Sequence, residues 1–276
     1  MTEGAAQIAR DSAALTATEA LEIAIGAARA AAALLVERFG GPAAGLRAKS
    51  SEVDMVSEAD VGAERAVVTY IRERRPDDAL VAEEGSQTAG RSGIQWYIDP
   101  LDGTTNYLYG VPHWAVAICC ADAHGALAGV VYDPLRDELF SALRAGGARV
   151  GDRRLATTTK ADLATALVAT GFGYGAAQRE TQGRILARVA GEVRDVRRFG
   201  SASLDLAYVA AGRWDAYFES VDKPWDWMAG ALLVREAGGR VSELTPADPA
   251  LPRIVASGLA LHEPLLALLA KATVGL

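Results

Sequence analysis

The spacing of apolar residues changes once along this 276-residue chain, and the change limits which folds are open to it. In residues 16–39, apolar side chains recur at three- and four-residue steps behind Thr16 and Glu19, which have capping-box spacing. A similar pattern begins near Ser57 or Asp60 and ends in a basic turn before a proline. The first part of the chain is therefore predicted to form two amphipathic helices.

Beyond residue 76, short apolar runs alternate with Gly, Pro, Asp and Ser, which is typical of strands. We expect strands at residues 79–82, 95–98, 114–120, 126–132 and 138–143. Turn residues at 122–125 predict an antiparallel hairpin. After about residue 152, strand-like and helix-like segments alternate. The chain is therefore predicted to be an α/β protein, with an α+β half at residues 1–151 and an α/β half at residues 152–276.

The composition excludes several classes of protein. Because 28 Lys and Arg stand against 35 Asp and Glu, the formal charge is −7, which argues against a basic nucleic-acid-binding protein. The sequence contains no run of about 18 uncharged apolar residues and no secretory signal at its start, so we expect a cytoplasmic protein without a membrane span. Cys119 and Cys120 are neighbours that point to opposite faces of a strand, so neither a disulfide nor a thiolate zinc site is expected.

The most informative motif is WYIDPLDGTTNYLYG at residues 96–110. An apolar strand runs into Asp99 and Asp102, and the proline between them lacks an N–H group, so we expect the chain to leave the sheet with both carboxylates. Gly103 permits a tight turn, and Thr104 offers a hydroxyl and an amide to an anion. Acidic ligands beside a phosphate-binding turn suit magnesium-assisted phosphoryl chemistry, whereas a lone Asp-Gly-Thr triplet is more often a capped turn.

Two other acidic sites favour the chemical interpretation. The adjacent Glu83 and Glu84 close an apolar run, and neighbouring strand ends would bring Glu83 close to Asp99. Asp226 lies at the start of a predicted helix between two tryptophans, which a capping role alone does not explain. Carboxylates that meet in a buried site repel one another, so a divalent cation is expected if these acids and Asp102 converge.

These motifs resemble those of the inositol monophosphatase family of magnesium-dependent, lithium-sensitive phosphatases. The family motif Asp-Pro-(Leu/Ile)-Asp-Gly-Thr-x-Asn-(Tyr/Phe)-x-x-Gly matches residues 99–110, and a Trp-Asp motif ending in Glu-Ala-Gly-Gly matches residues 225–239. The resemblance extends over residues 49–239. It implies a five-layered αβαβα sandwich, a homodimer, and a small phosphate ester as substrate, with myo-inositol phosphate hydrolysed by a metal-activated water.

The resemblance also implies two to three magnesium ions in each active site. Glu83, Asp99 and the Leu101 carbonyl would bind one ion, and Asp99, Asp102 and Asp226 would bind a second. Asp99 would bridge the two ions. Glu83 would also contact a third, weaker ion.

Further residues take roles from the same resemblance. Thr104 and Asp60 resemble the pair that orients and deprotonates the attacking water, and Glu84 is an additional acid nearby. Lys49 matches a basic residue on a loop near the metals. The implied substrate-binding residues, which hold the phosphate through amides or contact the inositol hydroxyls, are Gly103, Thr104, Ala202 and Glu219.

Related substrates and mechanisms provide the first set of alternatives. Phosphatases with an Asp-x-Asp-Gly-Thr nucleophile are excluded, because Pro100 stands two residues before Asp102. Fructose 1,6-bisphosphate, histidinol phosphate and 3′-phosphoadenosine nucleotides are substrates of related enzymes, and residues 105–107 resemble the inositol branch more than the nucleotide branch. The bisphosphate option stays open because Arg197 and Arg198 could meet a second phosphate, although we interpret both as charge balance at a strand end.

A non-catalytic regulatory protein is the alternative from another class. Some bacterial relatives act on the transcription machinery through protein contacts, but a scaffold would not need an intact set of ligands. His113, His124 and His262 lie outside the motifs, and we interpret them as structural or surface residues.

Overall fold

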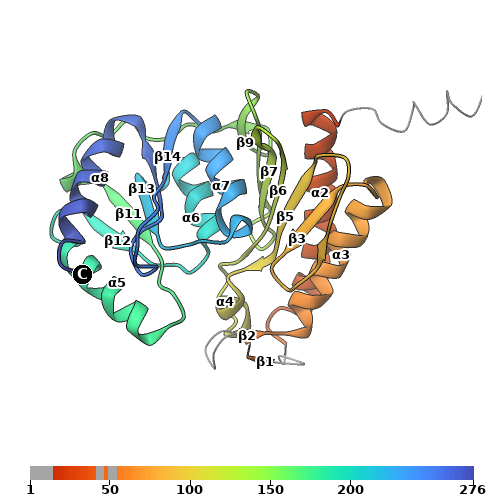
Figure 1. The fold of residues 1–276 in the computed structure, drawn as a ribbon, viewed down its shortest axis with the longest axis horizontal. Helices are drawn as coiled ribbons and strands as arrows, with labels where there is room; N and C mark the ends of the chain where they lie inside the picture. The colour runs from red at the N-terminus through yellow and green to blue at the C-terminus, as the bar shows by residue number, and fades with distance from the viewer. Residues whose placement is uncertain (1–14, 42–46, 49–54) are drawn as a thin grey trace, which may run out of the picture.

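The fold is built in layers, with helices on both faces of each of two sheets. The computed structural model describes residues 15–41, 47–48 and 55–276. An eight-stranded sheet and a five-stranded sheet share a helix layer between them, and each has a further helix layer on its outer face (Figure 1). The five-layered αβαβα sandwich predicted from the sequence is confirmed.

The outer helices of the first half are α2 (Ala17–Arg38) and α3 (Glu58–Arg74). Thr16 caps α2 in the predicted capping box, and Ser57 caps α3 in a second one that uses Asp60. The buried face of α2 consists mostly of alanines, so this helix approaches both α3 and the sheet closely. No helix among the described residues combines the length and the apolar character needed to cross a bilayer.

The eight-stranded sheet contains every strand predicted for the first half. In spatial order its strands are β10 (Arg153–Arg154), β9 (Gly147–Val150), β8 (Glu138–Leu143), β7 (Gly125–Asp133), β6 (Ala115–Asp122), β5 (Gln95–Asp102), β3 (Ala79–Ala82) and β4 (Gln87–Thr88). The predicted antiparallel hairpin joins β6 to β7, whereas β3 and β5 are parallel. A separate pair, β1 (Arg47–Ala48) and β2 (Met55–Val56), is antiparallel.

Strand β5 corrects the prediction that the chain leaves the sheet at Pro100. Asp99 pairs with Ala117 and Asp102 pairs with Ala115, so two residues of β5 oppose one residue of β6. This β-bulge accommodates the missing proline N–H and lets the strand continue to Asp102. Both aspartates are therefore held by the sheet itself.

The second half contains a mixed sheet between two helix layers. Its strands in spatial order are β12 (Asp195–Arg197), β11 (Leu167–Thr170), β13 (Ala216–Glu219), β15 (Ile254–Gly258) and β14 (Gly239–Glu243). Its helices are α5 (Ala176–Val189) and α8 (Leu259–Ala272) on the outer face, and α6 (Ala202–Ala210) and α7 (Pro224–Glu236) on the inner face. The first three strands are parallel, and β15 runs antiparallel to both of its neighbours. The predicted α/β character is confirmed.

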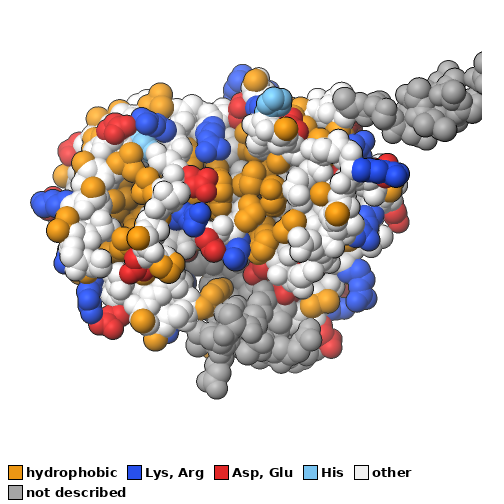
Figure 2. All heavy atoms as spheres, in the orientation of Figure 1, with side chains coloured by type: hydrophobic (Ala, Val, Ile, Leu, Met, Phe, Trp, Pro, Cys, Tyr) orange, Lys and Arg blue, Asp and Glu red, His pale blue; other side chains and the backbone are white. Residues whose placement is uncertain are grey.

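The two halves share one hydrophobic core, because α7 packs against strands of both sheets. Gly129 on β7 makes this approach possible, since a Cβ atom there would lie 3.1 Å from the backbone of Ala229. Figure 2 shows hydrophobic side chains gathered in the hollow between the halves, with lysines and arginines scattered around it. The division at residues 151 and 152 stays a prediction.

The two cysteines lie on opposite faces of β6, as predicted. Cys119 faces the core shared with α6 and α7, and Cys120 faces the core under α2 and α3. Both thiols are buried and free. Burial raises the pKa of Cys119 to about 12, so this side chain acts as a small apolar residue.

His113 provides a test of the packing between the halves. Its ring centroid lies 5.0 Å from that of Phe199 and 6.0 Å from that of Tyr208, and Nε2 has no hydrogen-bond partner among the described residues. Burial, assisted by the charge of Arg136, lowers the pKa of His113 to about 4. The unfolded chain therefore binds a proton more readily, and stability is lost as the pH falls from about 6.5 towards 4.

We expect the His113→Phe variant to lose less stability on acidification than the wild type. Protonation of His113 in the unfolded chain should lower the unfolding free energy of the wild type by roughly 2 kcal/mol at pH 5. The phenyl ring of the variant cannot be protonated. Urea unfolding at pH 7.5 and pH 5.0 measures the difference. An equal loss in both proteins would show that His113 is not buried as a neutral ring.

Candidate active site

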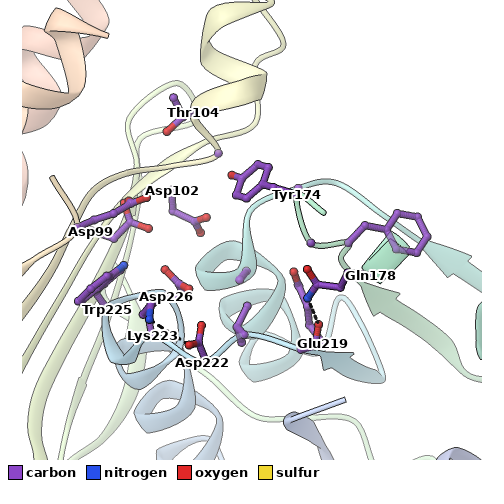
Figure 3. A pocket seen from close by; sticks show the side chains of 18 of the residues that line it. Asp99, Asp102, Thr104, Tyr174, Gln178, Glu219, Asp222, Lys223, Trp225 and Asp226 are labelled. Carbon is purple, nitrogen blue, oxygen red and sulfur yellow. Dashed lines mark hydrogen bonds and ion pairs between the residues drawn. The ribbon is translucent and has the colours of Figure 1, made fainter. Parts of the chain in front are cut away.

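A cavity of about 520 Å³ lies between the two halves, and it gathers residues that are distant in the sequence (Figure 3). One wall comes from the β3–β4 turn, the end of β5 and the start of α4 (Thr104–Leu108), and the other from α6, β13 and α7. The predicted site residues that line it are Glu83, Asp99, Leu101, Asp102, Gly103, Thr104, Ala202, Glu219 and Asp226. Asp60 and Glu84 do not line it, and Lys49 lies outside the described residues.

Four of these residues, Glu83, Asp99, Asp102 and Asp226, form what we call the acidic cluster. Burial is the largest cause that raises the pKa values of Asp99, Asp102 and Asp226. Neighbouring negative charges add to the effect, and Asp99 responds to all three other members of the cluster. The acids therefore lie close enough to destabilise one another's charged forms.

The donor atoms of the acidic cluster fit magnesium. Carboxylate oxygens and the Leu101 carbonyl on the same wall are hard oxygen ligands, which Mg²⁺ prefers. Among the described residues, no three Asp, Glu, His or Cys side chains are already arranged as a complete metal-binding group. Magnesium does not need one, because it keeps several of its waters and completes its coordination with substrate phosphate.

Asp102 is held in place by the first turn of α6. Its Oδ2 accepts hydrogen bonds from Ser201 Oγ at 2.6 Å, from the Ser203 amide at 2.7 Å and from the Ser203 hydroxyl. No hydrogen bond from a described residue reaches Oδ1, which remains available to a ligand. These serines link the acid on β5 to a helix of the other half.

Thr104 and Asp60 form the contact that the resemblance implied. The Thr104 hydroxyl lies 3.0 Å from Asp60 Oδ1 and 3.1 Å from the Leu101 carbonyl oxygen, so its single proton goes to one of the two. The other oxygen of Asp60 accepts hydrogen bonds from the amide and hydroxyl of Ser57. Within the part of the chain that the structure describes, Thr104 therefore links Asp60 to the cavity wall.

Gly103 precedes α4 in a left-handed conformation, with φ of 99°. A Cβ atom there would lie 3.1 Å from the carbonyl oxygen of His113 and 3.2 Å from Trp114 Cβ, so a larger residue would strain the turn and crowd its neighbours. The turn therefore brings the chain directly from Asp102 to Thr104 along the cavity wall. The role of its amides in phosphate binding stays a prediction.

Glu64 on α3 fixes the turn that carries Glu83 and Glu84. The amide of Glu84 donates to Glu64 Oε2 at 2.7 Å, and the amide of Ser86 donates to Oε1 at 3.0 Å. Sequence reasoning missed this contact. The signal was present, since Glu64 lies four residues after Asp60 and thus on the same face of the helix.

Glu219 stands on the wall away from Asp99, as Figure 3 shows. Tyr217, which is fully buried, donates its hydroxyl proton to Glu219 Oε2 at 2.9 Å. Burial raises the pKa of Glu219 to about 7, and the hydrogen bond from Tyr217 and the charge of Arg198 oppose that rise. Gly171 leaves the space that this carboxyl occupies, because a Cβ atom at Gly171 would lie 2.0 Å from it.

Comparison with known proteins identifies the family of this chain. The model of the inositol monophosphatase family matches residues 16–274. The chain belongs to the inositol monophosphatase family. Nus factor SuhB of Escherichia coli strain K12 is 44% identical over 227 residues, which cover 82% of this chain and 85% of that protein.

Solved structures of the inositol monophosphatase family share the fold. The inositol monophosphatase from Anabaena (Nostoc) sp. PCC 7120 is 35% identical, covers 92% of this chain and 96% of its own, and gives a TM-score of 0.79. SuhB of Mycobacterium tuberculosis is 37% identical, covers 93% of this chain and 98% of its own, and gives a TM-score of 0.78. These proteins support a phosphatase and leave its substrate open.

Two arginines of this inositol monophosphatase family member behave differently from each other. Arg197 pairs with Asp195 at 2.5 Å, which agrees with the prediction of charge balance. Arg198 lines the cavity, where its charge opposes the rise in the pKa values of Glu219 and Asp205. Adjacent residues at a strand end point to opposite sides, and the sequence did not indicate which side faces the cavity.

The other side chains singled out in the sequence divide between the cavity and the core. Trp225 lines the cavity beside Asp226, whereas Trp227 packs into the shared core, so only one tryptophan forms the expected apolar wall. The histidines do not line the cavity. His262 is buried between the hydroxyls of Ser242 and Ser257, which is a structural role.

We expect the Tyr217→Phe variant to raise the pKa of Glu219 above about 7. The variant removes the O–H donor that stabilises the ionised carboxylate, so the pKa of Glu219 should rise by about one. Infrared titration of the carboxylate band measures the pKa, with Glu219→Gln as the control that identifies the band. A pKa that stays the same or falls would show that Tyr217 does not hold Glu219.

Proposed function

We propose that this protein is a magnesium-dependent phosphomonoesterase that hydrolyses a small polyol phosphate, with myo-inositol phosphate as the first candidate. The observation that carries the proposal is the acidic cluster on the wall of one cavity, beside Thr104 and its partner Asp60. Family membership supports phosphatase chemistry. The substrate is inferred from Glu219 and Ala202, which offer a hydrogen-bond acceptor and free space to a polyol ring.

The acidic cluster would hold magnesium together with the Leu101 carbonyl; the members of the cluster are Glu83, Asp99, Asp102 and Asp226. When bound, magnesium supplies Lewis-acid stabilisation of the attacking and leaving oxygens and lowers the pKa of water. The acidic cluster is negatively charged, so an anionic substrate would be repelled by the bare acids. With magnesium bound, the substrate would meet the positive charge of the ion instead.

As the P–O bond to the attacking water forms, the water would give its proton to Thr104 Oγ1 while the Thr104 proton passes to Asp60 Oδ1, and the leaving alkoxide would take a proton from water. When the Thr104 hydroxyl donates to Asp60 Oδ1, Oγ1 becomes the acceptor that faces the cavity, so water there is oriented towards the phosphorus. Ser57 holds the second oxygen of Asp60 and fixes the direction of the pair. The amides of Gly103 and Thr104 hold the phosphate oxygens, and Glu219 accepts a hydrogen bond from a polyol hydroxyl.

A regulatory role is the second candidate, because the Escherichia coli relative is named Nus factor SuhB. Such a role would use the outer surface and not the cavity. The Asp99→Asn variant separates the candidates, since it should abolish phosphate release while a regulatory activity in transcription assays would remain. The expected homodimer, cytoplasmic location and absence of nucleic-acid binding stay predictions.

A panel of phosphate esters tests the proposed function. Phosphate release from inositol 1-phosphate, fructose 1,6-bisphosphate, histidinol phosphate and adenosine 3′,5′-bisphosphate should require magnesium and stop when EDTA is added. We expect the nucleotide to be the poorest substrate, because Glu219 and Ala202 suit a polyol. Release that is independent of magnesium, or fastest from the nucleotide, would contradict the proposal.

Two variants should separate metal binding from proton handling. We expect Asp226→Asn to weaken magnesium binding in calorimetry and to lower kcat. Thr104→Ala should lower kcat by about 100-fold or more and leave magnesium affinity within about twofold, because Thr104 acts on water and not on the ion.

The exposed neighbour Thr105, which does not line the cavity, provides the matched control. Its Thr105→Ala variant should resemble the wild type in both measurements. If Thr104→Ala instead weakened metal binding as much as Asp226→Asn does, Thr104 would have only a structural role.

A further inference from the structure

One side of the cavity is carried by the ends of two neighbouring parallel strands. Strand β11 ends at Thr170 and β13 ends at Glu219, and the two pair in parallel, so the segments that follow them leave the sheet at the same edge. These segments, residues 172–175 and 219–223, line the cavity, and we call them the polyol wall. Tyr174 and Glu219 stand on this wall in Figure 3. The separation of the two segments sets the shape of the wall.

Gln182 lies behind the polyol wall, on the buried face of α5. It is the polar member of a stripe that also contains Ile185 and Val189, and only 7% of its surface is exposed. Gln182 does not line the cavity. Burying a side-chain amide is costly unless it is hydrogen-bonded. A glutamine in this apolar stripe is therefore expected to have specific partners.

The side-chain amide of Gln182 bridges the two segments of the polyol wall. Its Oε1 accepts a hydrogen bond from the Gly173 amide at 2.9 Å, and its Nε2 donates to the hydroxyl oxygen of Ser220. Because a backbone amide can only donate, the first contact fixes which end of the side chain meets each segment. One planar amide thus ties the segment after β11 to the segment after β13.

The other polar contacts of the polyol wall do not replace this bridge. Arg179 donates to two backbone carbonyls, both of which lie in the first segment. Gln178 also donates to Ser220, at 3.3 Å, but the Gln178 side chain lines the cavity itself. Within the described part of the chain, Gln182 is the buried side chain that bonds to both segments.

Little free space remains behind the polyol wall. The cavity there has a volume of about 10 Å³, which is room for at most about one water, and Gln182, Glu219 and Ser220 are among the residues that line it. The bridge therefore lies in a closely packed region, where a change of side chain is transmitted to the segments that it holds.

We propose that Gln182 is a positioning residue that sets the affinity of the cavity for the polyol part of the substrate. This inference rests on the proposed function, because it assumes that the polyol extends from the acidic cluster to the polyol wall. The bridge holds Ser220 and its neighbour Glu219 at a fixed separation from residues 172–175. A ring with several hydroxyls can contact both segments at once only while that separation is kept.

Direct binding measurements test the inference separately from turnover. In the Thr104→Ala protein with magnesium, calorimetry gives dissociation constants for inositol 1-phosphate and for inorganic phosphate, which lacks the polyol. Adding Gln182→Met, which removes both hydrogen bonds and keeps a side chain of similar length, should weaken inositol 1-phosphate binding about tenfold. Phosphate binding should stay within about twofold. In the otherwise wild-type protein, Gln182→Met should raise KM and leave kcat within about twofold.

Val189→Ala is the matched control, since it weakens the packing of the same face of α5 without changing a residue of the bridge. It should lower the Tm and leave both dissociation constants unchanged. The inference is overturned if Gln182→Met weakens both ligands equally or neither of them. It is also overturned if Val189→Ala weakens inositol 1-phosphate binding as much as Gln182→Met does.

Ser220→Ala opens the bridge from its other end and keeps the test decisive if Gln182→Met does not fold. It should weaken inositol 1-phosphate binding about threefold or more and leave phosphate binding within about twofold. The combined variant should bind no more weakly than Gln182→Met alone, because both changes break one bridge. Unchanged affinity in Ser220→Ala, or effects that multiply in the combined variant, would contradict the bridge.

The proposed function is tested by a different outcome, which is phosphate release by the wild type from inositol 1-phosphate. If release occurs and the affinity for inositol 1-phosphate does not depend on Gln182, only the positioning role is refuted. If no ester releases phosphate while the affinity does depend on Gln182, the cavity binds polyol phosphates and the proposed function fails.

Discussion

The structure depends on the burial of several carboxylates at the junction of two sheets. Removing a charged acid from water is costly, and placing acids next to one another adds repulsion. Burial and mutual repulsion both raise the pKa of Asp99, the most deeply buried member of the acidic cluster. A fold that keeps such a group together must support each acid on the side away from the cavity. The side that faces the cavity must stay open to a counter-charge.

The supports of the cluster come from every layer around the cavity. The β-bulge at Pro100 keeps Asp99 and Asp102 on the sheet, and α6 holds one oxygen of Asp102 through two serines. Glu64 on α3 fixes the turn of Glu83, and α7 carries Asp226. Because α7 packs against both sheets, the relative position of the halves sets the geometry of the cluster.

Much of this arrangement could be predicted from local sequence patterns. The helix beginning at Thr16, the hairpin at residues 122–125 and the opposite orientation of the two cysteines follow from short-range rules of capping, turn formation and strand alternation. Three of the acids that line the cavity, Asp99, Asp102 and Asp226, were identified because the motifs at residues 99–110 and 225–239 are long and specific.

What could not be predicted depends on contacts between distant segments. Whether a proline ends a strand or is absorbed in a bulge depends on the partner strand, which a local pattern does not specify. The side on which Arg198 lies depends on where β12 ends relative to α6. The support of Asp102 by Ser201 and Ser203 joins residues about a hundred positions apart, and small polar residues carry no signal of such a role.

The thermal stability of the metal-free and magnesium-bound protein tests the central claim most directly. Scanning calorimetry at pH 8 compares the wild type with Asp226→Asn, which removes one repelled charge and keeps the shape of the side chain. The account predicts that magnesium raises the Tm of the wild type, whereas the metal-free variant is more stable than the metal-free wild type and gains less from magnesium. The account would be contradicted if magnesium did not change the Tm of the wild type and the metal-free variant were less stable than the metal-free wild type.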